Sequence, residues 1–290
     1  MALILGKPLA ETTLIAIKER VVAFVARHKA PPTLALIRVG EDAASAVYLK
    51  NKVCCAEKVG IRTQLLSYPT TALPEEVARQ IAVLNADSTV HGIIVQLPLP
   101  HHFAAEALIE QIAPEKDVDG LTTTTQGHLF RGAPCLAPCT AQGILQLLRT
   151  VHRDLTGMHA VVLGRSLIVG RPVGLMLLHA QCTVTLMHSR SRRVPDLCRQ
   201  ADIVISAVGQ PHLVTKNFIK EGATVIDVGI SRLPTPEGTM RLVGDVDFEE
   251  VAPIAGFITP VPGGVGPMTV CCLMKNTLDA AENQRKEHGI

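Results

Sequence analysis

The chain has 290 residues, of which 47% are hydrophobic and 3% are aromatic, and it contains no Trp. Its 28 basic and 26 acidic residues leave a formal net charge of +2, which excludes the strong positive field of a protein that binds nucleic acid or an anionic membrane. A small molecule is therefore the expected ligand. A core built from Val, Ile, Leu and Ala is typical of buried parallel sheets, so we predict the α/β class.

Nothing in the sequence predicts export or a membrane anchor. The N-terminal stretch MALILGKPLAE has neither the basic region nor the long apolar region of a signal peptide. No segment reaches the roughly 18 apolar residues of a membrane span. We expect a cytoplasmic protein with no membrane partner.

The eight cysteines do not form the pattern of a metal site. Cys54-Cys55 and Cys271-Cys272 are adjacent pairs, and Cys135 and Cys139 lack a second pair at ligand spacing. A free Cys usually behaves as a small buried hydrophobe. We expect reduced, mostly buried thiols and no bound metal.

In the first half of the chain, segments with apolar residues at helical spacing alternate with short apolar runs. In order, they predict helix 12–28, strand 33–39, helix 43–59, strand 61–68, helix 74–86, strand 92–97 and helix 103–112. The start of helix 74–86 is marked by Pro74 and two glutamates. This alternation predicts parallel strands joined by right-handed crossovers.

A loop-rich stretch from Pro114 to Pro138 interrupts the alternation, and we place a domain boundary there. After it, the pattern predicts helix 140–152, strand 159–163, helix 170–180, strand 182–187, helix 194–200, strands 202–206, 223–227 and 254–258, and a final helix 268–282. Such a series is typical of a doubly wound, Rossmann-like nucleotide-binding domain. The pattern leaves open which domain receives the final helix.

The strand HAVVL runs into a glycine turn at Gly164, and a helix follows from Val169-Gly170. The free N–H groups at a helix start can bind phosphate. However, Ser166 stands where the usual dinucleotide fingerprint has its second glycine. An ordinary strand-to-helix turn is therefore an equal alternative for this segment.

The next strand, CTVTLM, ends in HSRSRR, which contains Ser189 and three arginines but no acid. An acid at this place binds the ribose of NAD, whereas an Arg accommodates the extra phosphate of NADP. Arg165 adds a guanidinium group within the turn itself. The pattern favours NADP, and a solvated loop is the alternative.

Tyr48 and Lys52 lie four residues apart on a predicted helix, so both side chains share one face. A partly desolvated Lys that is hydrogen-bonded by a phenol has a lowered pKa and can transfer protons at neutral pH. On spacing alone, an exposed helix face is the favoured interpretation. Short-chain dehydrogenases share the Tyr-x-x-x-Lys spacing, but their pair follows the nucleotide turn, whereas this one precedes Gly164 by 112 residues.

Two further polar features stand at the ends of predicted elements, where open α/β sheets bind ligands. Gln96 closes the strand GIIVQ, and Asp117 and Asp119 lie in EKDVDG. Alternatively, the Gln satisfies loop backbone and the Asp residues are turn formers.

Nine short motifs, taken together, indicate a family more specifically than any one of them does. VYLKNK, VQLPLP, PEKDVDGL, PCTAQG, VLGRSLIVGRP, ADIVISAVGQP, VIDVGI, GDVDF and TPVPGGVGPMT occur in this order over nearly the whole chain. The sequence closely resembles the bifunctional methylenetetrahydrofolate dehydrogenase/methenyltetrahydrofolate cyclohydrolase family. One difference is Ser231 in VGIS, where many relatives have Asn.

The resemblance implies two α/β domains around a cleft: a folate-binding catalytic domain of residues 1–138 plus 268–290, and a Rossmann-like NADP-binding domain of residues 139–267. It implies a homodimer that takes tetrahydrofolate derivatives as substrates in one-carbon metabolism. NADP⁺ removes a hydride from 5,10-methylenetetrahydrofolate, and water opens the resulting 5,10-methenyl cation to 10-formyltetrahydrofolate.

The resemblance also implies roles for particular residues. Lys52 matches the catalytic lysine, Tyr48 its helper, Gln96 the glutamine that works with the lysine, and Asp119 the aspartate that holds the pterin. Further folate contacts are implied for Val95, Leu97, Pro262, Gly263, Gly264, Val265 and Gly266. Cofactor contacts are implied for Gly164, Arg165, Ser166, Ser189 and Ile230.

Two other functions compete with this interpretation. A shikimate-dehydrogenase-like reductase would share the two-domain plan and a polar lysine in the cleft. A non-catalytic folate- or nucleotide-binding protein would keep the fold alone. The complete set of Tyr48, Lys52, Gln96 and Asp119 argues against the second alternative, because a degenerate site should have lost at least one of them.

Overall fold

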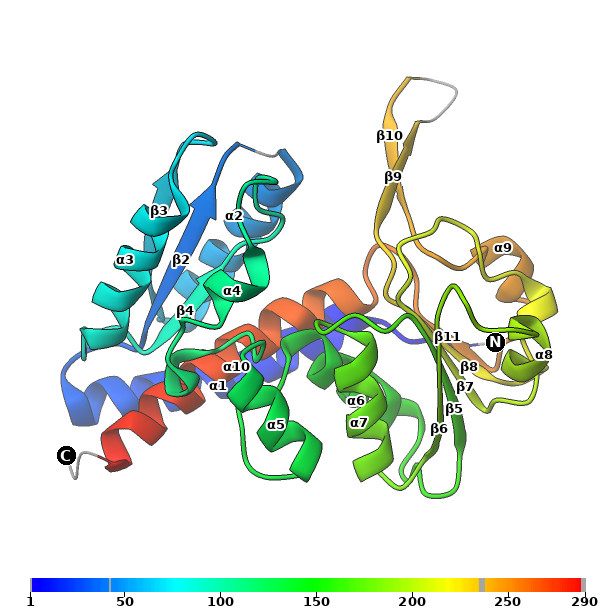
Figure 1. The fold of residues 1–290 in the computed structure, drawn as a ribbon. Helices are drawn as coiled ribbons and strands as arrows, with labels where there is room; N and C mark the ends of the chain where they lie inside the picture. Colours follow the sequence, from blue (N-terminus) through cyan, green and yellow to red (C-terminus); the bar gives the residue numbers. More distant parts are fainter. Residues whose placement is uncertain (1, 42, 235–237, 288–290) are drawn as a thin grey trace. The chain divides into compact units, whose positions relative to one another are not determined.

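The computed structural model of the protein describes residues 2–41, 43–234 and 238–287 (Figure 1). The chain forms two compact units. The three-stranded unit contains Glu11–Cys139 and Val270–Ile290, and the six-stranded unit contains Met1–Ala10 and Thr140–Thr269. Each unit is therefore assembled from two separate stretches of the chain.

The three-stranded unit has a parallel sheet in the order β3-β2-β4, formed by Arg62–Tyr68, Thr33–Val39 and Gly92–Val95. Its helices are α1 (Gly6–His28), α2 (Ala43–Val59), α3 (Pro74–Ala86), α4 (Ala105–Ile109), α5 (Thr123–Arg131) and α10 (Val265–Glu287), with a 3-10 turn η1 at Pro114–Lys116. Helices α1 and α10 both begin in the other unit. Strand β2 is buried almost throughout, as expected of a strand covered on both faces.

One face of β2 packs against α3. Ala35, Ile37 and Val39 of the strand share a cluster with Val77 and Ile81 of the helix. Burying one Val or Ile side chain stabilises the fold by about 1.5–3 kcal/mol. This packing fixes the sheet, and with it the position of the residues that follow the carboxyl end of β4.

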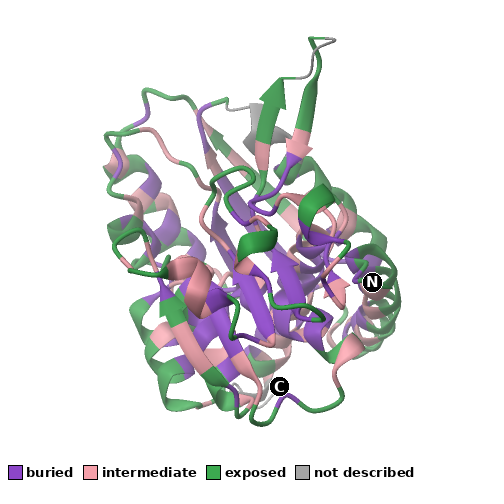
Figure 2. Ribbon diagram, turned by 90° about the vertical axis from the view of Figure 1, so that its right-hand side faces the viewer, coloured by how far each residue is buried: buried purple, intermediate pink, exposed green. Residues whose placement is uncertain are grey.

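The six-stranded unit has an entirely parallel sheet. Its order is β1-β11-β8-β7-β5-β6, formed by Ala2–Leu3, Phe257–Ile258, Thr224–Asp227, Ile203–Ser206, His159–Leu163 and Thr183–Met187. The central strands are buried (Figure 2). After β5 the chain adds β6 on one side and β7 on the other, and the carboxyl ends of strands at such a switch point are where open α/β sheets bind ligands.

The other elements of this unit surround the sheet. They are α6 (Cys139–Val151), α7 (Gly170–His179), α8 (Val194–Cys198), α9 (Phe248–Val251), a 3-10 turn η2 (Lys216–Phe218) and the antiparallel pair β9 (Ser231–Pro234) and β10 (Met240–Val243). The predicted α/β class and the parallel sheet of the Rossmann-like domain are confirmed. Helix 74–86 and strand 159–163 have the predicted bounds.

Several elements differ from the prediction. The stretch from Pro114 to Pro138 is not all loop, because it contains α5. Its run of threonines has low helix propensity, but the Thr122 hydroxyl accepts the N–H of Thr125 and Gly132 ends the helix with φ 67°. Helix α10 starts at Val265 rather than 268, and the β9–β10 hairpin was not predicted.

No helix among the described residues is both long and apolar enough to cross a membrane. All eight cysteines are free thiols, and five of them are buried. Within the described ranges, no group of three or more His, Cys, Asp or Glu side chains is arranged to hold a metal ion.

Candidate active site

The structure brings Lys52 and Gln96 into direct contact in the three-stranded unit. Lys52 Nζ on α2 donates to Gln96 Oε1, just beyond β4, at 2.9 Å. The Gln96 backbone N–H donates to the Ile37 carbonyl at 2.8 Å, and its side-chain Nε2 donates to the Leu97 carbonyl at 2.6 Å. The amide is therefore held with its oxygen toward the lysine. Gln96 does bind loop backbone, as the alternative interpretation expected, and it binds Lys52 as well.

Lys52 is half-buried, and this burial lowers the pKa of its ammonium group. The negative charges available at Asp119 and Cys139 act in the opposite direction. Burial also raises the pKa of the Asp119 carboxyl, opposed by Lys52. A hydrogen bond from Tyr48 was expected to contribute to the lowered pKa of Lys52, but the largest cause is burial. A lysine with a lowered pKa is a better proton acceptor near neutral pH.

The two aspartates of EKDVDG have different roles. Asp117 is buried, and its carboxylate accepts the backbone N–H groups of Gly120, Leu121 and Thr122 at 2.8–3.1 Å. Asp119 instead interacts with the charge of Lys52 and, through a side-chain hydrogen bond, with Cys139. The turn-forming interpretation therefore holds for Asp117, whereas Asp119 belongs to the Lys52 cluster.

The remaining predicted residues of this unit flank the cluster. Tyr48 lies one helical turn before Lys52 on α2, with 37% of its surface exposed. Val95 is buried at the end of β4, and Leu97 is half-buried after Gln96. Cys139 was not predicted as a site residue, although its motif PCTAQG was noted, because a buried, reduced thiol was expected to behave only as a small hydrophobe. Its buried thiol interacts with Asp119, and burial raises its pKa.

The glycine turn of the six-stranded unit is built around Ser166. The Ser166 hydroxyl accepts the N–H groups of Val169 at 3.1 Å and Gly170 at 3.4 Å, and its carbonyl accepts the N–H of Arg171 at 3.1 Å. The first N–H groups of α7 are thus already bonded, contrary to the expectation that they are free for phosphate. At this turn the exposed side chains, rather than these N–H groups, are accessible to a ligand.

Two glycines allow this turn to form. Gly164 has φ 108°, and a Cβ on it would lie 2.2 Å from the Ala207 carbonyl oxygen after β7. A Cβ on Gly170 would lie 2.0 Å from the Gly164 carbonyl oxygen. The turn therefore needs glycine at positions 164 and 170, and Ser166 fills the place of a missing glycine by capping the helix.

The side chains predicted to contact the cofactor are exposed. Arg165, Ser166 and Ser189 are all open to solvent, and so are Arg190 and Arg192 at the carboxyl end of β6. Arg193 differs, because its Nε lies 3.1 Å from an Asp196 carboxylate oxygen. Ile230, beyond β8, is also exposed.

Two buried acids, missed as positioning residues, hold the backbone next to this turn. Asp245 accepts the N–H of Val208 at 2.7 Å and the hydroxyl of Ser206 at 3.1 Å. Asp227 accepts three backbone N–H groups, including that of Asp245 at 2.9 Å. Burial raises the pKa of Asp227 to about 6. Their motifs, VIDVGI and GDVDF, were noted in the sequence, but only structure gives them these partners.

The segment Pro262–Gly266 leads from β11 into α10. A Cβ on Gly264 would lie 2.7 Å from the Pro260 carbonyl oxygen, so the turn itself requires this glycine. Among the described residues, no atom lies within 4 Å of a Cβ built on Gly263 or Gly266. Gly263 has φ 106°, a conformation that itself favours glycine, so close approach of a ligand is left as an explanation only for Gly266.

Comparison with known proteins agrees with this geometry. Residues 4–119 match the family model of the tetrahydrofolate dehydrogenase/cyclohydrolase catalytic domain, and residues 138–285 match that of the NAD(P)-binding domain of the same family. The bifunctional protein FolD of Caulobacter vibrioides is 49% identical over 286 residues, covering 97% of this chain and 96% of the relative.

Solved structures give the same result. The bifunctional FolD methylenetetrahydrofolate dehydrogenase/cyclohydrolase of Campylobacter jejuni aligns with a TM-score of 0.93 and 41% identity, over 98% of this chain and 99% of that one. The Trypanosoma brucei enzyme, complexed with NADP and an inhibitor, aligns with a TM-score of 0.93 and 39% identity over 98% of both chains. Both domain models and these relatives set aside the shikimate-dehydrogenase alternative. The chain belongs to the tetrahydrofolate dehydrogenase/cyclohydrolase family.

Proposed function

We propose that this chain oxidises 5,10-methylenetetrahydrofolate to 5,10-methenyltetrahydrofolate with NADP⁺ and hydrolyses the product to 10-formyltetrahydrofolate. The observation that carries the proposal is the 2.9 Å hydrogen bond from Lys52 to Gln96, beside Asp119, in a chain of this family. A half-buried lysine that is held by an amide and has a lowered pKa suits the proton transfer of the hydrolytic step.

The roles proposed for the individual side chains are those that the family resemblance implies. Asp119 holds the pterin of the folate, and Tyr48 assists Lys52 at the start of the same helix. In hydrolysis, a water molecule adds to the methenyl carbon, one carbon–nitrogen bond breaks, and a proton is released. Lys52 accepts that proton, while Gln96 fixes the direction of its amine. Val95, Leu97 and Pro262–Gly266 contribute the remaining folate contacts.

The residues of the six-stranded unit fit a phosphorylated dinucleotide. The glycine turn has no Cβ at positions 164 and 170, and the exposed Arg165 and Ser166 project from it. NADP⁺, when bound, supplies the hydride acceptor. Ser189, with the exposed arginines after it, would hold the 2′-phosphate, because no acid follows β6 to bind a free ribose hydroxyl. Ile230 completes the set of contacts.

A coupled spectroscopic assay tests both halves of the proposal. With methylenetetrahydrofolate and NADP⁺, we expect NADPH to form while methenyl absorbance rises and then decays, and we expect no NADPH with shikimate. A preference for NAD⁺ would contradict the proposal that the residues after β6 hold the 2′-phosphate of NADP⁺. Methenyl absorbance that accumulates without decay would contradict the role of Lys52.

We also infer, from the family resemblance, that the protein is a cytoplasmic homodimer and that the three-stranded unit, Glu11–Cys139 with Val270–Ile290, is the folate-binding catalytic domain. At the edge strand β6, Leu186 is exposed, and so is Leu178 of the preceding α7, which supplies apolar surface for a second copy to cover. Sedimentation equilibrium would test this, and a monomer at micromolar concentration would contradict it.

A further inference from the structure

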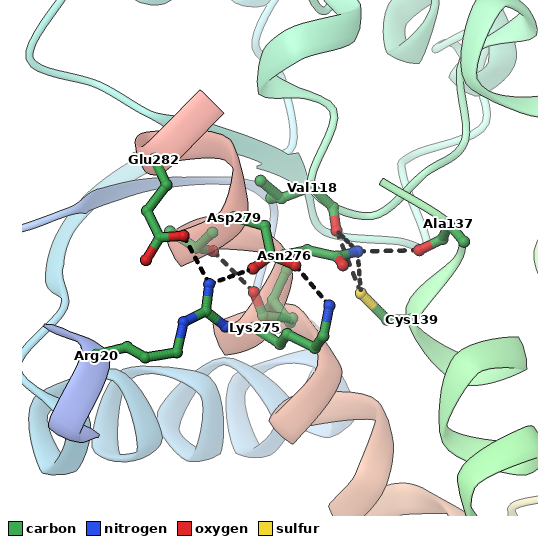
Figure 3. Close-up of polar contacts among 10 residues, drawn as sticks. Arg20, Val118, Ala137, Cys139, Lys275, Asn276, Asp279 and Glu282 are labelled. Atoms are coloured by element: carbon green, nitrogen blue, oxygen red, sulfur yellow. Dashed lines mark hydrogen bonds and ion pairs between the residues drawn. The ribbon is translucent and has the colours of Figure 1, made fainter. Parts of the chain in front are cut away.

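A single buried amide on α10 connects two loops of the three-stranded unit. Asn276 is 1% exposed, and its Nδ2 donates to the Val118 carbonyl at 2.8 Å and to the Ala137 carbonyl at 2.9 Å (Figure 3). The same nitrogen lies 3.5 Å from Cys139 Sγ. The amide donors of Asn276 are thus directed at the two loops that lead into the Lys52 cluster.

The acceptors of Asn276 are next to functional residues. The Val118 carbonyl belongs to the peptide bond that joins Val118 to Asp119, so its direction constrains where the Asp119 side chain starts. The Cys139 thiol donates to the same Val118 carbonyl at 3.2 Å. Asp119 and Cys139 are also the two acidic groups that act on Lys52. Asn276 therefore fixes the backbone just before Asp119, at Val118, and just before Cys139, at Ala137.

The two loops are also in close contact with each other. Gly120 has φ 74°, and a Cβ on it would lie 2.4 Å from the Leu136 carbonyl oxygen and 2.6 Å from the Pro138 nitrogen. From the other side, Asp117 binds three N–H groups of its own loop. With the loop so constrained, a small displacement at Asn276 is transmitted to Asp119 rather than absorbed.

We propose that Asn276 is a positioning residue for the reaction: its two carbonyl contacts set the place of the Asp119 carboxyl and, through it, the binding of folate. The proposal rests on the role proposed above for Asp119. Asn276 acts only through the loops that it holds.

The same helix provides a matched control. Gln284 lies eight residues further along α10 and is also buried, and its Nε2 donates to the His91 and Glu115 carbonyls, each at 2.9 Å. The chemistry is the same, namely one side-chain amide that binds two carbonyls. However, His91 precedes β4, at the opposite end of that strand from Gln96. The other acceptor, Glu115, lies in η1 four residues before Asp119, but Asp117 between them is held by its own three N–H bonds. Loss of Gln284 should therefore weaken the fold with little movement of Asp119.

The experiment compares Asn276→Leu, the milder Asn276→Ser, Gln284→Leu and Asp119→Asn in the full chain. For each variant, thermal unfolding, the KM values for methylenetetrahydrofolate and NADP⁺, and the pH profile of methenyl hydrolysis are measured. We expect Asn276→Leu to raise the folate KM about 10-fold and to shift the pH profile, because small misplacements at a reacting site are costly. The KM of Asn276→Leu for NADP⁺ should stay within about twofold of that of the unmodified protein. Asn276→Ser should raise the folate KM by less than Asn276→Leu does. Gln284→Leu should lower the unfolding temperature while both KM values and the profile stay normal.

Three results distinguish the possible failures. If Asp119→Asn raises the folate KM but a folded Asn276→Leu or Asn276→Ser variant keeps a normal KM and pH profile, the positioning role is overturned while the proposed function survives. Equal effects of the Asn276 and Gln284 variants on the folate KM would also overturn it. If Asp119→Asn itself leaves the folate KM unchanged, the role of Asp119 fails, and the positioning role fails with it.

Discussion

The Lys52 cluster and the glycine turn place their functional groups in opposite ways. In the three-stranded unit the reactive side chains are themselves half-buried and bonded to each other, as Lys52 is to Gln96. In the six-stranded unit the buried groups are backbone and structural acids, while Arg165 and Ser189 are exposed. Proton transfer requires desolvation, which shifts a pKa. Phosphate binding requires charged groups that are accessible, on a backbone that is already fixed.

The largest expected effect tests the desolvated cluster. Lys52→Met removes the proposed proton acceptor, so we expect methenyl hydrolysis to fall by about 10²–10⁴-fold, the usual contribution of a general base. Folate binding should be partly retained. Stopped-flow measurement of methenyl decay checks this. Lys50→Met, on an exposed position of the same helix, is the control and should be near normal.

The fixed backbone of the turn is tested by Gly170→Ala. The new Cβ would lie 2.0 Å from the Gly164 carbonyl oxygen, so we expect the Kd for NADP⁺ to rise about 100-fold. Fluorescence titration with NADPH gives this value. Gly127→Ala places a Cβ in open space within helix α5 and should stabilise the protein by about 0.5 kcal/mol. Normal NADPH binding by a folded Gly170→Ala variant would contradict the turn geometry.

The exposed charges should have a smaller effect, because each is solvated and replaceable. Arg190→Ala and Arg192→Ala should each weaken NADP⁺ binding about 10-fold and leave NAD⁺ binding unchanged. Arg193→Ala serves as the comparison, since Arg193 already pairs with Asp196. Kd measurements with both nucleotides distinguish these variants. An equal loss for NAD⁺ would show that the arginines do not bind the 2′-phosphate.

The smallest effect concerns stability, where the two units should respond to pH with opposite signs. Burial lowers the pKa of His91 from 6.5 to about 4, so the unfolded chain takes up its proton first and the three-stranded unit loses stability as pH falls from 6.5 toward 4. Burial raises the pKa of Asp227 from 3.8 to about 6, so the six-stranded unit gains stability as pH falls through 6.

Between pH 6.5 and 5 we expect shifts of roughly 1 kcal/mol in each direction. Hydrogen exchange of peptides from each unit, measured across this range and corrected for intrinsic rates, would resolve them. His91→Gln keeps an acceptor for the Thr33 N–H, which donates to His91 Nδ1 at 3.1 Å, and should remove the slope in its own unit only. If the stability of both units changed with pH in the same direction, the assignment of these effects to His91 and Asp227 would be wrong.

The fold was largely predictable because its signals are local. Pro74 and the two glutamates after it mark the start of α3, and HAVVL is apolar after its first residue. Helix α5 was missed because its stability comes from a cap and from packing rather than from its threonines. The hairpin β9–β10 escaped prediction because its strands are short and mostly exposed.

The family motifs allowed the site residues to be proposed one by one, but they did not predict the interactions of these residues. Ser166 was recognised as a departure, yet only the structure shows its hydroxyl bonded to the first N–H groups of α7. Cys139 was expected only to be a buried, reduced thiol. The three partners of Asn276 lie between 137 and 158 positions before it in the chain, and no spacing rule connects such distant groups.

The division of each unit between two stretches of chain affects the order in which the protein can mature during synthesis. Strand β1 is translated long before β11, the strand with which it pairs. Helix α10 is translated after β11, and with it the amide that holds the Asp119 loop. Lys52 and Gln96 are thus translated long before that loop is secured, so normal folate binding should arise only after α10 has emerged from the ribosome.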